Sequence, residues 1–103
     1  MHVVHPKDTQ EQITEVFPHR TLLPPEVGGG LSIYLLTVTH ANPHAHEEAQ
    51  VYIVQSGCGV MEIEDERQEV GPGCLVYIPG GRRHALRPTG GAPVVLYSIV
   101  HHP

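Results

Sequence analysis

From residue 31 onward the chain alternates short apolar runs with turn residues. Gly and Pro clusters separate the runs, as in "GPG" at 71–73 and "PTGG" at 88–91. The runs are rich in Val, Ile, Leu and Tyr, are of strand length, and cover residues 31–39, 50–55, 58–64, 67–70, 74–78 and 93–100. Six strands at this spacing predict an all-β domain built from two facing sheets or a barrel.

The first part of the chain has a different pattern. Residues 8–16, "DTQEQITEV", predict one or two helical turns, with Asp8 as the N-cap and Pro18 just beyond the end. Residues 20–30 contain two prolines and three glycines. They predict an extended arm and flexible connector along a sheet edge, because proline cannot donate to a central ladder.

Length and composition narrow the class of protein. A chain of 103 residues can enclose one core, so we expect one domain, with residues 1–30 as an N-terminal arm packed on a barrel of residues 31–103. The chain lacks an apolar run near the ~18 residues of a membrane helix, and its start lacks a signal peptide's apolar centre. These features predict a cytoplasmic protein with no membrane partner. Cys58 and Cys74 are too few for a disulfide framework and are expected to be small buried residues.

The charge balance argues against a nucleic-acid partner. The formal net charge is -5, and six Lys and Arg residues provide no basic stripe that could follow a phosphate backbone.

The segment "HANPHAHEEAQ", residues 40–50, has the composition of a metal site. In an unbroken strand alternate side chains share a face, which here would carry His44, His46, Glu48, Gln50 and Tyr52. Two imidazoles on one face can converge on one ion at about 2.1 Å. His84 follows the tight turn "IPGGRR" and is the candidate third ligand. The alternative is a chance pattern on a solvated strand face.

Two spaced motifs extend this interpretation. Residues 44–57 read H-x-H-x3-Q-x6-G and residues 73–88 read G-x5-P-x-G-x2-H-x3-P. Together they resemble the two signature motifs of the cupins, over about residues 31–100. The resemblance implies a double-stranded β-helix, the cupin jelly-roll barrel, with one divalent metal ion inside (Zn, Mn, Ni, Fe or Co). At the matching positions it implies the ligands His44, His46, Gln50 and His84.

Three positions depart from the cupin pattern: Val38 stands for the first motif's opening glycine, Gln50 for its acidic ligand, and Pro88 for the second motif's closing asparagine. Gln50 changes the chemistry, because a neutral amide ligand leaves a divalent centre at +2 where glutamate would leave +1. Such a centre is a stronger Lewis acid, attracts anionic oxygen donors and disfavours a ferric state. The alternatives are a metal-free cupin that keeps only the pocket, or Glu47 or Glu48 as a ligand on a bulged strand.

The resemblance also indicates a reaction class. Some cupins with three histidines and a glutamine open or isomerise cyclic sugar acids, which favours a metal-dependent isomerase or lyase-like enzyme for a sugar acid or similar oxygen-rich metabolite. Tyr52 and Glu48 are the candidates for proton transfer. The alternatives are a non-haem metal dioxygenase and a non-catalytic sugar- or ligand-binding module.

The remaining expectations concern partners. Arg82, Arg83 and Arg87 are candidates to bind an anionic small-molecule substrate, or else to pair with the acidic hairpin at 62–69. A homodimer is expected, formed through residues 18–27 or an exposed sheet edge, because a small two-sheet domain leaves edges to be covered.

Overall fold

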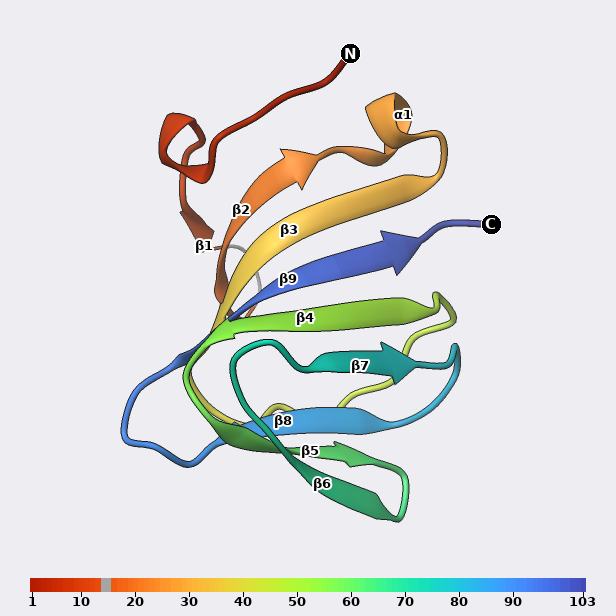
Figure 1. Cartoon of the computed structure of the whole chain (residues 1–103). Coiled ribbons are helices and arrows are strands. Elements are labelled where there is room, and N and C mark those ends of the chain that lie inside the picture. The colour runs from red at the N-terminus through yellow and green to blue at the C-terminus, as the bar shows by residue number, and fades with distance from the viewer. Residues whose placement is uncertain (14–15) are drawn as a thin grey trace.

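The structure is a computed structural model that describes residues 1–13 and 16–103, and its chain is almost entirely β (Figure 1). The described strands form two antiparallel sheets, in the orders β1-β2-β3-β9-β4-β7 and β6-β5-β8. Their bounds are β1 Gln12–Ile13, β2 Pro18–Leu23, β3 Leu31–Val38, β4 Gln50–Ser56, β5 Gly59–Ile63, β6 Glu66–Val70, β7 Leu75–Ile78, β8 His84–Pro88 and β9 Val94–His101. This confirms the all-β prediction and the jelly-roll arrangement of the barrel.

The six strands predicted from residue 31 onward are all present, within two residues at each end. The sequence pattern missed β8, because its residues "HALRP" follow two arginines and end in proline. β8 pairs with β5 and completes the smaller sheet.

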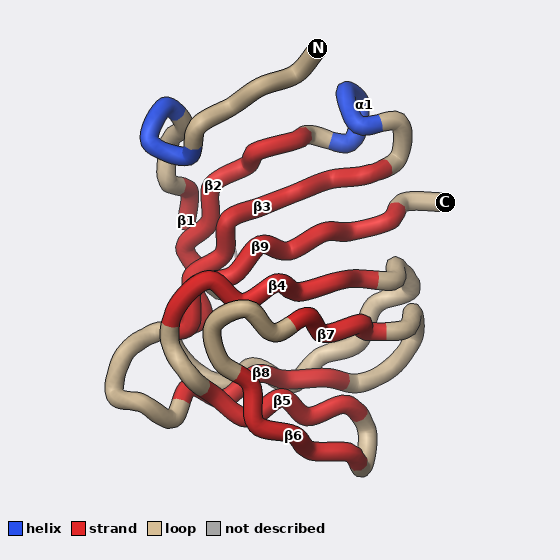
Figure 2. Tube along the Cα trace, viewed as in Figure 1, coloured by secondary structure: helices blue, strands red, loops and turns tan. Residues whose placement is uncertain are grey.

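The N-terminal predictions need correction. The prediction of a helix over residues 8–16 is wrong. A 3-10 turn, η1 (Pro6–Asp8), ends at Asp8, and β1 follows it. Residues 14–15 of that prediction lie outside the described residues. Among the residues that the structure describes, helical structure is confined to η1 and the single turn α1 (Pro25–Gly28) (Figure 2).

Residues 20–30, predicted as an extended arm and flexible connector, divide into two parts: residues 20–23 belong to β2, and Pro25–Gly28 form α1. β2 pairs in register with β3 from His19 to Leu23, with one bulge between Thr21 and Leu23. Its extended character and edge position were predicted correctly, because only the two residues of β1 pair along its other side. The arm is therefore part of the larger sheet.

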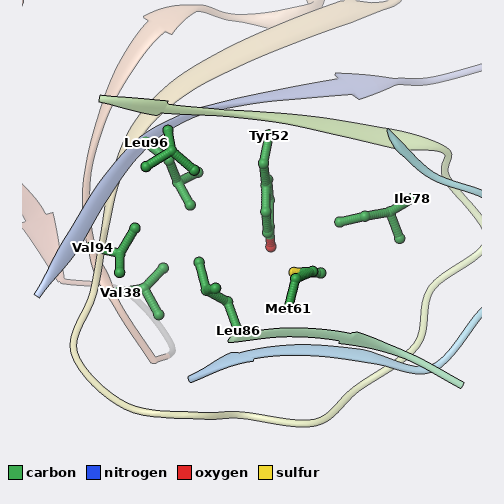
Figure 3. Close-up of a cluster of buried hydrophobic side chains, with 8 residues drawn as sticks. Val38, Tyr52, Met61, Ile78, Leu86, Val94 and Leu96 are labelled. Carbon is green, nitrogen blue, oxygen red and sulfur yellow. The ribbon is translucent and has the colours of Figure 1, made fainter. Parts of the chain in front are cut away.

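The core lies between the two sheets (Figure 3). Figure 3 shows Tyr52, Leu96 and Ile78 projecting from the larger sheet toward Met61 and Leu86 of the smaller one. Burying each large aliphatic side chain stabilises the fold by roughly 1.5–3 kcal/mol. The smaller sheet thus covers the inner face of the larger sheet at β9, β4 and β7.

The opposite face of the larger sheet, which we call the outer face, is also apolar. Two rows of side chains cross β3, β9, β4 and β7 on it: Ile33, Ile99, Val51 and Tyr77 in one, and Leu35, Tyr97, Ile53 and Leu75 in the other. All eight are partly or largely exposed, Leu75 at 64% and Tyr77 at 58%. Within residues 1–13 and 16–103, no segment covers them as the smaller sheet covers the inner face.

Three smaller findings complete the fold. Cys58 is exposed, contrary to prediction, because it lies in the turn before β5, whereas Cys74 is partly buried. A hollow of about 300 Å³ lies between β6 and β7 and is lined in part by Met61 and Val76. In the described part of the chain, no helix has the length and apolarity needed to cross a membrane.

Candidate metal centre

Backbone contacts bring the two motif segments together. The main chains of His44 and His84 form an isolated antiparallel bridge, with N···O distances of 3.1 and 2.9 Å. The Gly81 amide donates to the His46 carbonyl at 2.7 Å. Gly80 approaches so closely that a Cβ there would lie 2.1 Å from the Glu47 carbonyl oxygen. The glycine turn therefore sets His84 beside His44 and His46.

The three imidazoles converge. One ring nitrogen from each of His44, His46 and His84 lies within 4.8 Å of the others, and the ring centroids are 4.4 to 5.6 Å apart. Residues 40 apart in sequence thus present three nitrogens to one point, as the motifs implied.

Each imidazole is oriented by the main chain. The Nδ1 atoms lie 2.6, 2.9 and 2.9 Å from carbonyl oxygens, of Asn42 for His44, of Glu48 for His46 and of Arg82 for His84. Because a carbonyl only accepts, each Nδ1 carries the hydrogen, and each Nε2 keeps its lone pair. Metal-binding histidines are oriented in this way.

His84 has the clearest need of a ligand. Its side chain is 2% exposed, and its buried Nε2 has no hydrogen-bond partner among the described residues. Burial lowers the pKa of His84; the bond to the Arg82 carbonyl opposes this, and the charges of His44 and His46 add to it. The neutral, metal-binding form is therefore favoured.

Gln50 completes the set. Its Nε2 donates to the Ser98 hydroxyl at 2.7 Å, which turns Oε1 toward His46 Nε2 at 3.0 Å. Because the hydrogen of His46 is on Nδ1, its Nε2 offers only a lone pair to Gln50 Oε1. Both atoms of this contact are therefore acceptors. Two ligand atoms held about 2.1 Å from one ion at right angles lie about 3.0 Å apart, so the contact suits a shared cation. The four residues fit a divalent metal.

Glu48 does not lie where an unbroken strand would place it. The chain bends at residues 47–48 and β4 begins only at Gln50, so the predicted continuous face from His44 to Tyr52 is wrong. Within the described residues the converging cluster contains the three histidines and no carboxylate. Glu48 contributes its main-chain carbonyl to His46, a role that no side-chain pattern shows.

Tyr52 remains near the site. It follows Gln50 on the inner face of β4, and its hydroxyl points toward Met61 of the smaller sheet (Figure 3). Burial raises the pKa of Tyr52 to about 12. The hydroxyl is therefore protonated at neutral pH and can donate a hydrogen bond.

The three arginines lie outside the cavity beside the metal centre. Arg82 and Arg83 are exposed, and the Arg87 guanidinium lies 3.9 Å from the Glu62 carboxylate. That pairing corresponds to the alternative considered for these arginines, contact with the acidic hairpin.

The cavity beside the metal centre has a volume of about 510 Å³. Its walls are mostly apolar or aromatic, with neutral polar groups between them, and comprise Val16, Phe17, His19, Tyr34, Leu36, Asn42, His44, Gln50, Tyr52, Ser98 and Val100. No Asp, Glu, Lys or Arg lines it among the described residues. The mixture is typical of a small-molecule site.

Ser98 and His19 are two of the wall residues that sequence reasoning did not assign to the site. Ser98 is 3% exposed and is the one small polar residue in the run "VVLYSIV", a signal that was present in the sequence. His19 lies in the N-terminal arm and matches no motif, so only the pairing of β2 with β3 brings it to the cavity.

Solved structures share this fold along nearly the whole chain. A predicted oxalate decarboxylase from Thermotoga maritima matches with a TM-score of 0.85 at 16% identity, covering 98% of this chain and 99% of that one. The polyketide cyclase RemF from Streptomyces resistomycificus matches with a TM-score of 0.83 at 24% identity, covering 98% and 79%. An RmlC-like cupin from Shewanella frigidimarina matches with a TM-score of 0.82 at 15% identity, covering 100% and 92%.

At these identities the structural matches establish the fold. The family follows from the sequence itself, because the model of the cupin domain matches residues 36–100. The motifs, the histidine cluster and this match agree, and the chain belongs to the cupin domain family.

Proposed function

We propose that the protein is a metal-dependent enzyme that redistributes a proton within a small oxygen-bearing substrate, as in isomerisation or ring opening. One observation carries the proposal: three histidines, each fixed by a main-chain carbonyl, present bare Nε2 atoms to one point next to a neutral glutamine oxygen. A divalent ion held there would act as a Lewis acid that polarises a carbonyl or hydroxyl oxygen.

The chain's own residues supply the surroundings. Ser98 holds the Gln50 amide with its oxygen toward the histidines, so the ligand set stays neutral. The protonated Tyr52 hydroxyl can donate a hydrogen bond to a substrate oxygen as negative charge develops there. The largely apolar and aromatic walls lower the local dielectric constant, which strengthens these electrostatic interactions.

The cavity also bears on the substrate. A sugar acid held by arginines is not supported, because Arg82, Arg83 and Arg87 do not line the cavity. Its neutral polar groups favour a substrate recognised through carbonyl and hydroxyl oxygens. Two similar structures carry the names of a polyketide cyclase and a predicted oxalate decarboxylase, and polyketides and oxalate are both carbonyl compounds.

The test is proton exchange in heavy water. Protein loaded in turn with Zn, Mn, Ni, Fe or Co is incubated with a panel of hydroxy-carbonyl and dicarbonyl compounds, and exchange of carbon-bound hydrogen is followed by NMR. We expect metal-dependent exchange next to a carbonyl in at least one compound, lost on chelation and in the His84→Ala variant.

Oxygen uptake separates this function from the dioxygenase alternative. Substrate loss that requires oxygen and proceeds without hydrogen exchange would support the dioxygenase. Full metal loading with neither exchange nor turnover across the panel would favour a ligand-binding module.

A further inference from the structure

The cavity continues beyond the metal centre to a second end formed by β2 and β3, which we call the distal end. It is defined by Phe17, His19, Tyr34 and Leu36. β2 is three strands away from β4, which carries Gln50, or roughly 14 Å along the sheet at about 4.8 Å per strand. A small substrate bound only at the metal would leave this end unused.

The walls of the distal end are suited to an aromatic or flat apolar group. The His19 and Tyr34 rings meet edge to face, with centroids 5.8 Å apart and an interplanar angle of 87°. Tyr34 lies directly across from Ser98 on β9, which joins this aromatic pair to the Gln50–Ser98 contact along the cavity floor. Aromatic rings prefer such offset and perpendicular partners.

His19 gives the distal end a polar group whose role as hydrogen-bond acceptor is defined. Its Nδ1 lies 3.3 Å from the Phe17 carbonyl oxygen and therefore carries the hydrogen. Its Nε2 is left as a hydrogen-bond acceptor. A substrate hydroxyl that reaches this end would be the donor.

We propose that the distal end binds an aromatic or planar apolar part of the substrate, with His19 accepting a hydrogen bond from a hydroxyl at its far end. The proposal rests on the proposed function only in taking the other end of the ligand to be an oxygen donor bound at the metal centre.

Three hydroxamates of increasing length test it on the Zn-loaded protein, by calorimetry. Acetohydroxamate reaches only the metal, naphthohydroxamate adds the planar body, and hydroxynaphthohydroxamate adds a hydroxyl on the far ring. We expect the naphthyl group to tighten binding at least about tenfold and the hydroxyl about threefold more. In the Tyr34→Ala variant the naphthyl gain should fall, and in His19→Phe only the hydroxyl gain should disappear.

The outcomes are distinguishable. Absence of acetohydroxamate binding to the Zn-loaded protein would show that the ion has no open coordination position and would reject the proposed function. Acetohydroxamate binding without a naphthyl gain in the wild-type protein would reject the distal end alone, and a hydroxyl gain that survives in His19→Phe would reject the role of His19. Metal content and circular dichroism confirm that each variant is folded.

Discussion

The two faces of the larger sheet depart in different ways from the usual pattern of an apolar buried face and a polar exposed face. The inner face buries polar side chains among its apolar ones: Gln50 bonded to Ser98, and Ser32 bonded to His102 at 2.8 Å. The outer face carries two uninterrupted apolar rows. Buried polar groups persist where they are hydrogen-bonded or bind something, and exposed apolar rows persist where another surface covers them. Inner-face changes should therefore alter metal and ligand binding, and outer-face changes should alter assembly.

The largest expected effect is on the inner side. His44→Ala/His46→Ala removes two of the three convergent imidazoles, so we expect metal affinity to fall by at least about a thousandfold, or roughly 4 kcal/mol. Elemental analysis after dialysis measures it, on protein made without a histidine tag. The His2→Ala/His5→Ala variant controls for histidine content. Stoichiometric metal in His44→Ala/His46→Ala would show that the ion is bound elsewhere.

Substitutions on the two faces should differ in their effect on the free energy of unfolding. Leu96 is fully buried on the inner face, and Leu96→Ala should lower the free energy of unfolding by about 3 kcal/mol through the cavity it leaves. Ile53→Ala on the outer face should cost about 1 kcal/mol or less, since its side chain already meets solvent. Urea unfolding measures both losses in a Leu75→Glu/Tyr77→Glu background, in which two charges on the outer face oppose association between copies of the chain. Equal losses would mean that the outer face is covered within the chain.

The glycine turn behind the histidines should give a smaller effect. In Gly80→Ala the new methyl group would meet the Glu47 carbonyl, so the turn must move, at a cost of about 2 kcal/mol and with weaker metal binding. Gly90→Ala is the control, because nothing lies within 4 Å of a Cβ there. Thermal unfolding with and without Zn measures both effects. A Gly80→Ala protein as stable as Gly90→Ala would show that the close approach is not needed.

The smallest expected effect comes from changing the charge of the metal centre. Gln50→Glu should retain the metal, since the Ser98 hydroxyl can rotate to donate to a carboxylate, but it lowers the charge of the centre. We expect acetohydroxamate to bind about tenfold more weakly, or ~1.4 kcal/mol. Gln55→Glu, exposed on the same strand, controls for the added charge. Titration of both fully loaded variants at matched ionic strength decides; equal affinities would show that Gln50 does not set the charge of the centre.

Much of the fold and the ligand cluster could be predicted because both depend on local patterns. Strand-length apolar runs located six of the strands, and motif spacing located His44, His46 and His84. What was missed depends on pairing distant in sequence. His19 reaches the cavity only because β2 joins β3, and the role of Glu48 arises from a bend that places its carbonyl at His46.

The main-chain anchoring of the three imidazoles has a consequence for how this site can diverge. A carbonyl is present whatever side chain a residue carries, so Asn42, Glu48 and Arg82 can mutate without turning the imidazoles that they hold. The cavity walls belong largely to other strands. Natural variation can therefore reshape substrate preference while the ligand set is inherited intact, and one barrel can give rise to a lineage of enzymes with different substrates.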